Sequence, residues 1–452
     1  MSTTSTDQGK MLGVVVMVRH GDRQGFYQDP STYTPSNTAI TPLGNLESFN
    51  LGQLVRSIYL NESSSSFIAG VNNSIVQDGQ VQVRADGGGE RGVIFNSAVS
   101  MLQGLWPPNA NYKSVQADGT TAQGPLNGYQ TVPIESVEPD NDVSLEGWTS
   151  CNTFNTATNA FYNSQEFKQV AAENADFLSQ LPQYLDGRPA TLENMWNIFD
   201  YLNVQFIHNA TFATALPPTF REQARALANF HERGVFSSPQ PDGIGNIAGH
   251  TVLPSIIQGL QNIIDPTNQQ KFMLQAMSYK PFISLFNMTG VAEVNPQLSG
   301  IVEYASAVAL EVRQPSTGGE PVIRFMFKNG TNDDAFVRYS FMNSTSDVPV
   351  STFINTLQPF AFSDLPTWCQ KCSNTKDRGC ANIGITSSPV TMVIGSHDMV
   401  GPVGAGFIGA SVTLVVMLAA LAVLSFTGFL SFGRKEKSRA RIGSESGSEY
   451  EK

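Results

Sequence analysis

The stretch Met11-Leu-Gly-Val-Val-Val-Met-Val18, followed directly by Arg19-His20-Gly21-Asp22-Arg23, decides the fold class. Its first part is a continuous apolar run rich in β-branched residues, which is typical of a strand buried on both faces of a parallel sheet. Such a strand delivers the charged residues after it to its carboxyl end, where open α/β sheets place their ligands. We therefore expect an α/β protein whose functional site begins at Arg19.

Strands and helices alternate after this segment. Thr41 and Pro42 open a helical pattern that runs through Ile58, with Thr41 as the N-cap. A second strand, Val81–Val83, ends at Arg84. Further helices are expected at Val93–Leu105, Pro281–Met288 and Val350–Leu357, and further strands at Lys271–Ala276, Ala305–Val312, Val322–Lys328 and Phe336–Phe341.

The middle of the chain has a different character. A loop rich in Gly, Asn and Gln gives way to helical patterns at Glu166–Gln180, Leu192–Phe206 and Thr219–Asn229. A strand–helix beginning, a helical insertion and a return to strands together predict an α/β fold, a three-layer, mostly parallel sheet with an inserted helical cap lobe.

Composition limits the class of protein. The 452 residues carry a formal net charge of −11, and 41 % are hydrophobic while only 14 % are charged. The hydrophobic fraction excludes a disordered or collagen-like chain. The acidic balance argues against nucleic acid as a partner, because phosphate neutralisation needs clustered Lys and Arg.

One segment near the end carries no charge, since none of the 35 residues between Asp398 and Arg434 is acidic or basic. About 20 apolar residues suffice to cross ~30 Å of hydrocarbon, so a single transmembrane helix and a lipid-bilayer partner are predicted. The basic residues after it place the tail in the cytoplasm, and the N-terminal part outside the cell or in a secretory or vacuolar lumen. No signal peptide is recognisable, so a tail-anchored protein with a cytosolic N-terminal part is the alternative.

These patterns give a domain organisation. We expect an α/β core over 11–110 and 266–365, a cap lobe over 111–265, a Cys-containing juxtamembrane strap over 366–400, a transmembrane helix over 404–432 and a cytoplasmic tail over 433–452.

Four cysteines accompany the strap, namely Cys151, Cys369, Cys372 and Cys380. Their even number predicts two disulfides, with the connectivity open; a metal or redox role for the Cys-x-x-Cys pair is the alternative. Six sequons permit N-glycosylation, at Asn61, Asn72, Asn209, Asn287, Asn329 and Asn343.

The motif at the end of the first strand suits phosphoryl transfer. An imidazole such as that of His20 attacks phosphorus and holds a phosphoryl group transiently. Guanidiniums bind phosphate oxygens with fork geometry, which gives Arg19, Arg23 and Arg84 the role of phosphate ligands. Because these arginines supply the positive charge, neither a metal nor another cofactor is expected.

The same residues resemble the histidine phosphatase superfamily, in its acid phosphatase and phytase branch. That family opens with Arg-His-Gly-x-Arg-x-Pro, and this chain has Arg19-His20-Gly21-Asp22-Arg23-Gln24-Gly25, with Gly25 in place of Pro. Ile40-Thr41-Pro-Leu-Gly44, Val83-Arg84 and Gly104-Leu-Trp-Pro-Pro108 continue the resemblance. It implies a phosphoglycerate mutase-like fold and hydrolysis of phosphomonoesters through a phosphohistidine at His20.

The family also uses a His-Asp pair, in which the His binds phosphate and the Asp protonates the leaving oxygen. The surrounding strands align Ser278 and Tyr279 with this pair, so the usual carboxylic acid is missing. His397-Asp398 supplies the literal dipeptide but stands only a few residues before the predicted membrane helix, and we interpret it as a coincidence. Tyr279 is a poor acid, and Asp22, Asp86 or Glu90 are other sources of the proton.

Three functions remain in competition. The first is a membrane-anchored acid phosphatase with an atypical general acid, and its substrate is a small phosphomonoester. The second is an inactive, phosphatase-like ectodomain that binds phosphate or inositol phosphates. The third is a structural surface protein with a vestigial pocket. The intact His20 and its arginines favour the enzyme.

Overall fold

The computed structural model describes residues 9–29, 34–90 and 92–383. The predicted membrane span at 404–432, the cytoplasmic tail and the His397-Asp398 dipeptide lie outside these residues. Within the described ranges, no helix combines the length and apolar character that a membrane crossing needs.

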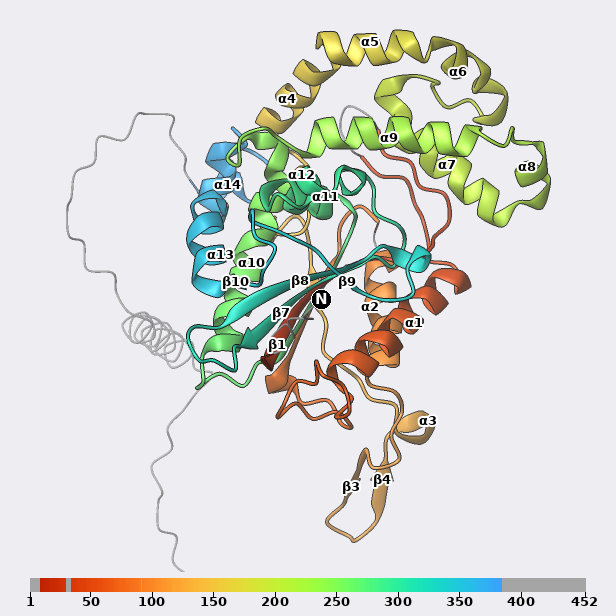
Figure 1. The fold of residues 1–452 in the computed structure, drawn as a ribbon. Helices are drawn as coiled ribbons and strands as arrows, with labels where there is room; N and C mark the ends of the chain where they lie inside the picture. Colours follow the sequence, from red (N-terminus) through yellow and green to blue (C-terminus); the bar gives the residue numbers. More distant parts are fainter. Residues whose placement is uncertain (1–8, 30–33, 91, 384–452) are drawn as a thin grey trace, which may run out of the picture. The chain divides into compact units, whose positions relative to one another are not determined.

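A central sheet organises the fold (Figure 1). Its strand order is β10-β8-β7-β1-β6-β2-β5, with β9 paired to β8. Its members are β1 (Lys10–Arg19), β2 (Val81–Asp86), β5 (Glu135–Val137), β6 (Phe272–Met277), β7 (Ala307–Gln314), β8 (Val322–Lys328), β9 (Val337–Arg338) and β10 (Val348–Pro349). A separate hairpin consists of β3 (Lys113–Val115) and β4 (Thr121–Gln123).

The sheet is mixed, which corrects the prediction of a mostly parallel one. Strands β1, β6, β2 and β5 pair in parallel, whereas β7 runs antiparallel to β1, and β8 runs antiparallel to β7. Strand β8 is antiparallel to β7 because their connection is short, and Gly318 and Gly319 within it both have positive φ. A connection this short makes a hairpin, because parallel neighbours need a longer crossover.

Strand β1 is buried on both faces, as its apolar sequence predicts. Val14, Val16 and Val18 pack in one core with helices α1 (Pro42–Tyr59) and α2 (Gly92–Leu105), while Val15 and Met17 belong to a second core that includes α10 (Ile247–Ile264). The alternation of side chains along a strand separates the two sets. The result is a three-layer arrangement around the strand that carries the Arg19–Arg23 motif.

The helices of the core are α1 (Pro42–Tyr59), α2 (Gly92–Leu105), α10 (Ile247–Ile264), α11 (Lys280–Met288), α12 (Val291–Val294), α13 (Val350–Leu357) and α14 (Leu365–Lys371), with the one-turn α3 (Pro125–Gly128) in the loop before β5. Helix α1 begins as predicted, because the Thr41 side chain accepts from the Gly44 N–H and Pro42 occupies the first turn. Helix α10 falls within the range 111–265 predicted for the cap lobe, yet it packs on the sheet at Val15 and Met273.

A group of helices stands over one end of the sheet (Figure 1). It consists of α4 (Asn152–Tyr162), α5 (Gln165–Glu173), α6 (Ala175–Gln180), α7 (Met195–His208), α8 (Ala210–Ala215) and α9 (Phe220–Phe236). The pattern over 166–180 that predicts one helix forms two, α5 and α6, because Asn174 ends the first and precedes the second.

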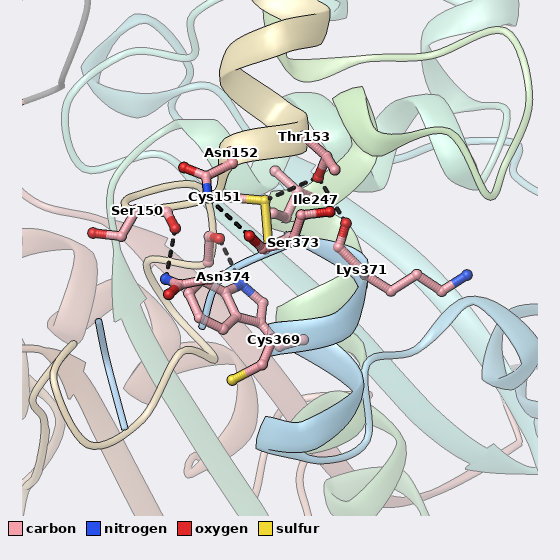
Figure 2. Close-up of a disulfide and its surroundings, with 12 residues drawn as sticks. Ser150, Cys151, Asn152, Thr153, Ile247, Cys369, Lys371, Ser373 and Asn374 are labelled. Atoms are coloured by element: carbon pink, nitrogen blue, oxygen red, sulfur yellow. Dashed lines mark hydrogen bonds between the residues drawn. A yellow bond between two sulfur atoms is a disulfide. The ribbon is translucent and has the colours of Figure 1, made fainter. Parts of the chain in front are cut away.

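Two disulfides fasten the C-terminal part of the described chain, as the cysteine count predicts. Cys151 pairs with Cys372, and Cys369 pairs with Cys380. Figure 2 shows the first of them, where the Thr153 hydroxyl donates to the Lys371 carbonyl at 2.7 Å. All four sulfurs are therefore in disulfides, and Cys369 and Cys372 of the Cys-x-x-Cys pair bond to different partners rather than to each other.

Candidate active site

Adjacent parallel strands bring the site together. Arg19, the last residue of β1, is in register with Met277, the last residue of β6. His20 continues the pairing, because its N–H donates to the Met277 carbonyl and its own carbonyl accepts from Ala305. Residues 20–23 and 278–280 therefore leave the same edge of the sheet, where α/β folds place ligands.

Gly21 allows helix α1 to approach this edge closely. A Cβ on Gly21 would lie 2.2 Å from the Gly44 carbonyl oxygen, so no other residue fits without moving the backbone. The Gly21 N–H donates to the Ser97 hydroxyl at 3.0 Å, which ties the motif to α2 as well. The motif is thus fixed by both helices on this face.

His20 is fully buried, and its ring is oriented by the backbone. Its Nδ1 lies 2.7 Å from the Gly21 carbonyl oxygen. A carbonyl only accepts, so Nδ1 carries the proton, and in the neutral ring the lone pair is on Nε2. Burial is the strongest influence on His20 and lowers its pKa; Arg19 and Arg23 act in the same direction, whereas Glu90 opposes them.

Glu90 stands against the reactive edge of this ring. Its Oε2 lies 3.0 Å from His20 Nε2, without the alignment of a hydrogen bond, and its Oε1 accepts from Arg23 Nε at 2.6 Å. Burial alone would raise the pKa of Glu90, but His20 and Arg23 outweigh it and hold that pKa well below its ordinary value. Glu90 is therefore a carboxylate that bridges the imidazole and a guanidinium.

The two guanidiniums of the motif have different surroundings. Arg23 is held between Glu90 and Asp200, whose Oδ1 lies 2.9 Å from Arg23 Nη2. Arg19 stacks on Tyr304, with Cζ 4.4 Å from the ring centroid, and its Nη1 donates to the Val302 carbonyl. The buried Nε of Arg19 has no hydrogen-bond partner among the described residues. Arg19 thus retains a free donor beside His20.

These groups surround a narrow cavity of about 30 Å³. Its polar lining includes Arg19, Arg23, Glu90, Asp200, Lys280 and Glu303. One water needs roughly 10–15 Å³ measured in this way, so the cavity has room for about two waters while Glu90 holds this position. A phosphoryl group needs more space than that.

Ser278 and Tyr279, aligned with the missing His-Asp pair, do reach this edge of the sheet. Ser278 is buried, and its hydroxyl has no hydrogen-bond partner in the described part of the chain. The Tyr279 ring lines the cavity, with Arg19 Cζ 5.1 Å from its centroid, but its hydroxyl donates to Glu232 at 2.7 Å. That proton is therefore directed to α9 of the helical lobe.

Arg84 is not brought to His20. Its guanidinium forms ion pairs with Glu135 at 2.9 Å and Asp142 at 2.6 Å, and it lines a different cavity, on the face covered by α10. The physical reason is the alternation of side chains along β2, since Arg84 lies within the strand and not beyond its carboxyl end. The sequence predicts how far along the strand Arg84 lies, but it does not predict which face of the sheet its side chain projects from.

The other carboxylates considered as proton sources have partners of their own. Asp22 is buried against His208, whose Nε2 lies 2.7 Å from Asp22 Oδ2. Asp86 is buried in the Gly-rich turn, where burial and then the nearby Glu146 raise its pKa well above its ordinary value. This shift favours the protonated carboxyl, but Asp86 does not line the cavity that Arg19 and Glu90 line.

Two residues that line the cavity, Asp200 and Lys280, are not among the site residues predicted from the sequence. Asp200 comes from α7, far along the chain from Arg23, and only the fold brings them together. Lys280 directly follows Ser278 and Tyr279 in the sequence, so the alignment that points to those two residues also indicates its position.

Comparisons with known proteins identify the family of the chain. A family model described as histidine phosphatase superfamily (branch 2) matches residues 25–342, a range that begins just after the Arg19–Arg23 motif. Bovine prostatic acid phosphatase is 21 % identical over 379 residues, covering 82 % of this chain and 89 % of that protein. Human lysosomal acid phosphatase is 23 % identical over 373 residues, covering 80 % and 81 %.

Solved structures share the fold. The phytase from Citrobacter braakii superposes with a TM-score of 0.53 at 14 % identity, over 79 % of this chain and 99 % of that one. A phytase from Klebsiella sp. ASR1 gives a TM-score of 0.52 at 14 % identity, over 81 % and 98 %.

Proposed function

The chain belongs to branch 2 of the histidine phosphatase superfamily, and on that premise we propose that it hydrolyses phosphomonoesters through a phosphohistidine at His20. The observation that carries the proposal is the orientation of His20. Its Nδ1–H is fixed on the Gly21 carbonyl, and its Nε2 faces Glu90, which lines the cavity together with Arg19 and Arg23. This is the arrangement that a nitrogen nucleophile needs.

The reaction has two steps. In the first, His20 Nε2 forms a bond to phosphorus while the bond from phosphorus to the ester oxygen breaks, and the leaving oxygen departs with the electron pair and takes a proton from water where it needs one. In the second, water attacks phosphorus, the nitrogen–phosphorus bond breaks, and inorganic phosphate leaves with His20 neutral again. Arg19 and Arg23 stabilise the charge on the transferring group in both steps.

The proton for the leaving oxygen has no dedicated donor of the usual kind. Position 279 carries a phenol, and its proton is engaged by Glu232. We therefore propose an atypical acid, with esters of acidic alcohols as the better substrates, because their leaving groups depart without protonation.

The test uses the full chain with p-nitrophenyl phosphate from about pH 3 to pH 8. We expect turnover, trapping of ³²P on the protein after acid-free quenching, and loss of both in His20→Ala. Turnover that is equal in His20→Ala and the parent would refute the phosphohistidine.

The second candidate is a phosphate-binding protein without turnover. Glu90 against Nε2, and Ser278-Tyr279 at the position where the family has its His-Asp pair, favour it. It predicts saturable binding of inorganic phosphate or an inositol phosphate with no product release, whereas the enzyme predicts both binding and release.

The proposal includes a single membrane anchor at 404–432, with the catalytic part in a lumen or outside the cell. The uncharged run and the basic residues after it support this, as do the two disulfides, which are typical of oxidising compartments. Resistance of the full chain to carbonate extraction, lost when the chain is cut at Thr386, is the expected result.

A further inference from the structure

Lys280 is a buried cation that its surroundings neutralise only in part. The residue is 4 % exposed and is the first of helix α11. Its Nζ donates to Gln28 Oε1 at 3.0 Å, and among the described residues no carboxylate is near enough to form an ion pair with it. An ammonium has three donors, and lysine is rarely buried without a charged partner.

Aromatic rings make up most of the remaining surroundings of this ammonium. Nζ lies 4.8 Å from the ring centroid of Tyr279, 5.4 Å from that of Trp148 and 5.8 Å from that of Phe236. Cation–π attraction offsets part of the cost of burial. The N-terminus of α11 works against it, because that end of a helix carries partial positive charge.

The carboxylates that act electrostatically on Lys280 from longer range make their direct contacts with other groups. Glu90, whose pKa Lys280 helps to lower, contacts His20 and Arg23. Glu146 accepts from the Gly89 N–H at 2.9 Å. Neither carboxylate pairs directly with the ammonium, so an anion that enters the cavity would find an unpaired cation there.

The place of Lys280 matches that of the phosphoryl site. Lys280 lines the same cavity as Arg19, Arg23 and Glu90. Arg19 Cζ and Lys280 Nζ lie 5.1 Å and 4.8 Å from the centroid of the same ring, that of Tyr279. The two cations come from the carboxyl ends of two strands that pair in parallel, β1 and β6.

We propose that Lys280 is a phosphate-binding residue whose ammonium contacts an oxygen of the phosphoryl group bound at His20, together with Arg19 and Arg23. The proposal rests on the phosphatase function proposed above, because it requires a phosphoryl group in this cavity. It gives the buried ammonium an anionic partner, and it supplies positive charge beside Ser278, where the family places an imidazole.

The experiment measures binding of inorganic phosphate and orthovanadate to the full chain by titration calorimetry, and kcat and KM for p-nitrophenyl phosphate. The variants are Lys280→Met, which keeps the length of the side chain, and Lys280→Gln, which keeps a donor. The matched control is Lys271→Met, which makes the same change just before β6, at the opposite edge of the sheet.

We expect both Lys280 variants to weaken phosphate binding about 10- to 100-fold, as the loss of a charge-assisted hydrogen bond implies, and the control to leave it unchanged. The melting temperature of Lys280→Met without phosphate should equal or exceed that of the parent, because removal of a partly compensated buried charge is often neutral or stabilising. The rise in melting temperature that phosphate produces should be smaller in the Lys280 variants than in the parent.

Other outcomes overturn the proposal in distinguishable ways. If the parent hydrolyses the ester or binds phosphate and both variants bind within about twofold of it, Lys280 is not a ligand but the phosphatase remains. If the parent neither binds nor hydrolyses, both proposals fail. If both variants lose the fold, Lys280 is a structural cation held by Gln28 and the rings.

Discussion

The Oε2 atom of Glu90 lies 3.0 Å from Nε2 of His20, the atom at which we propose that a phosphohistidine forms. The same carboxylate accepts from Arg23 Nε, so it contacts both the imidazole and one of the guanidiniums proposed to bind phosphate. Glu90 also raises the pKa of His20 and so favours the cationic ring, which is not a nucleophile. In the proposed reaction, substrate therefore has to displace this carboxylate before His20 can react.

Glu90→Gln is expected to bind inorganic phosphate and vanadate about tenfold more tightly than the parent. Removal of the charge relieves repulsion of the incoming dianion, while the amide oxygen still accepts from Arg23. Because the pKa of Glu90 is held well below its ordinary value, the difference should persist across mildly acid pH. Calorimetric titration from about pH 5 to pH 8 measures it.

The control for this prediction is Glu303→Gln. Glu303 lines the same cavity but pairs with Arg225 at 2.6 Å and does not contact His20. Its substitution is expected to leave phosphate affinity within about twofold of the parent. Weaker phosphate binding in Glu90→Gln would show that Glu90 supports the anion site instead of obstructing it.

The identity of the leaving group is expected to control the rate. With no carboxyl at position 279, p-nitrophenyl phosphate should be hydrolysed at least about 100-fold faster than glycerol 2-phosphate, since general acid catalysis typically contributes 10²–10⁴-fold. The ratio of the two kcat/KM values measures this dependence. In the double variant Ser278→His/Tyr279→Asp the ratio should fall, because the alkyl ester gains a proton donor. An unchanged ratio would place the acid at another residue.

The sequence predicts the site residues that directly follow β1, but it does not predict those that distant segments contribute. The run Met11–Val18 identifies a doubly buried strand because its apolar residues leave no polar face, and the motif after it must then lie at the sheet edge. Arg84 is misassigned because height along a strand does not specify the face. Asp200 joins Arg23 only through the packing of the helical lobe, which carries no motif.

The same distinction applies to the fold. Helix α1 follows from local periodicity and the Thr41 cap, and α13 from local periodicity, and the structure places both as predicted. Helix α10 was not predicted as a separate element, since it contains Pro254 and is apolar on most sides, so it lacks the usual stripe. The antiparallel pairing of β8 with β7 follows from a short turn, whereas the direction of β7 beside β1 is known only from the structure.

The two disulfides are expected to contribute unequally to stability. Cys151 and Cys372 are 221 residues apart in sequence, whereas Cys369 and Cys380 are 11 apart. In the loop-entropy account, removal of the first costs about 5 kcal/mol and removal of the second about 3 kcal/mol. Urea unfolding of the two Cys→Ala double variants measures both, and equal losses would show that local packing outweighs loop closure.

Stability should also depend on pH through Glu47, whose side chain accepts from the Asp22 N–H at 2.7 Å. Burial, together with the neighbouring Asp22 and Glu303, raises the pKa of Glu47 from 4.5 to about 7. The folded state therefore binds a proton that the unfolded state has released between these two values, and the free energy of unfolding falls as the pH rises through this range. Because Glu47 is partly exposed, we expect the free energy of unfolding to fall by about 1–2 kcal/mol between pH 5 and pH 8.

Glu47→Gln, which retains an acceptor for Asp22, should abolish this part of the pH dependence, whereas Glu222→Gln at an exposed position of α9 should preserve it. Denaturant unfolding of the three proteins at both pH values measures the difference, and a Glu47→Gln curve parallel to the parent's would assign the pH dependence to other groups.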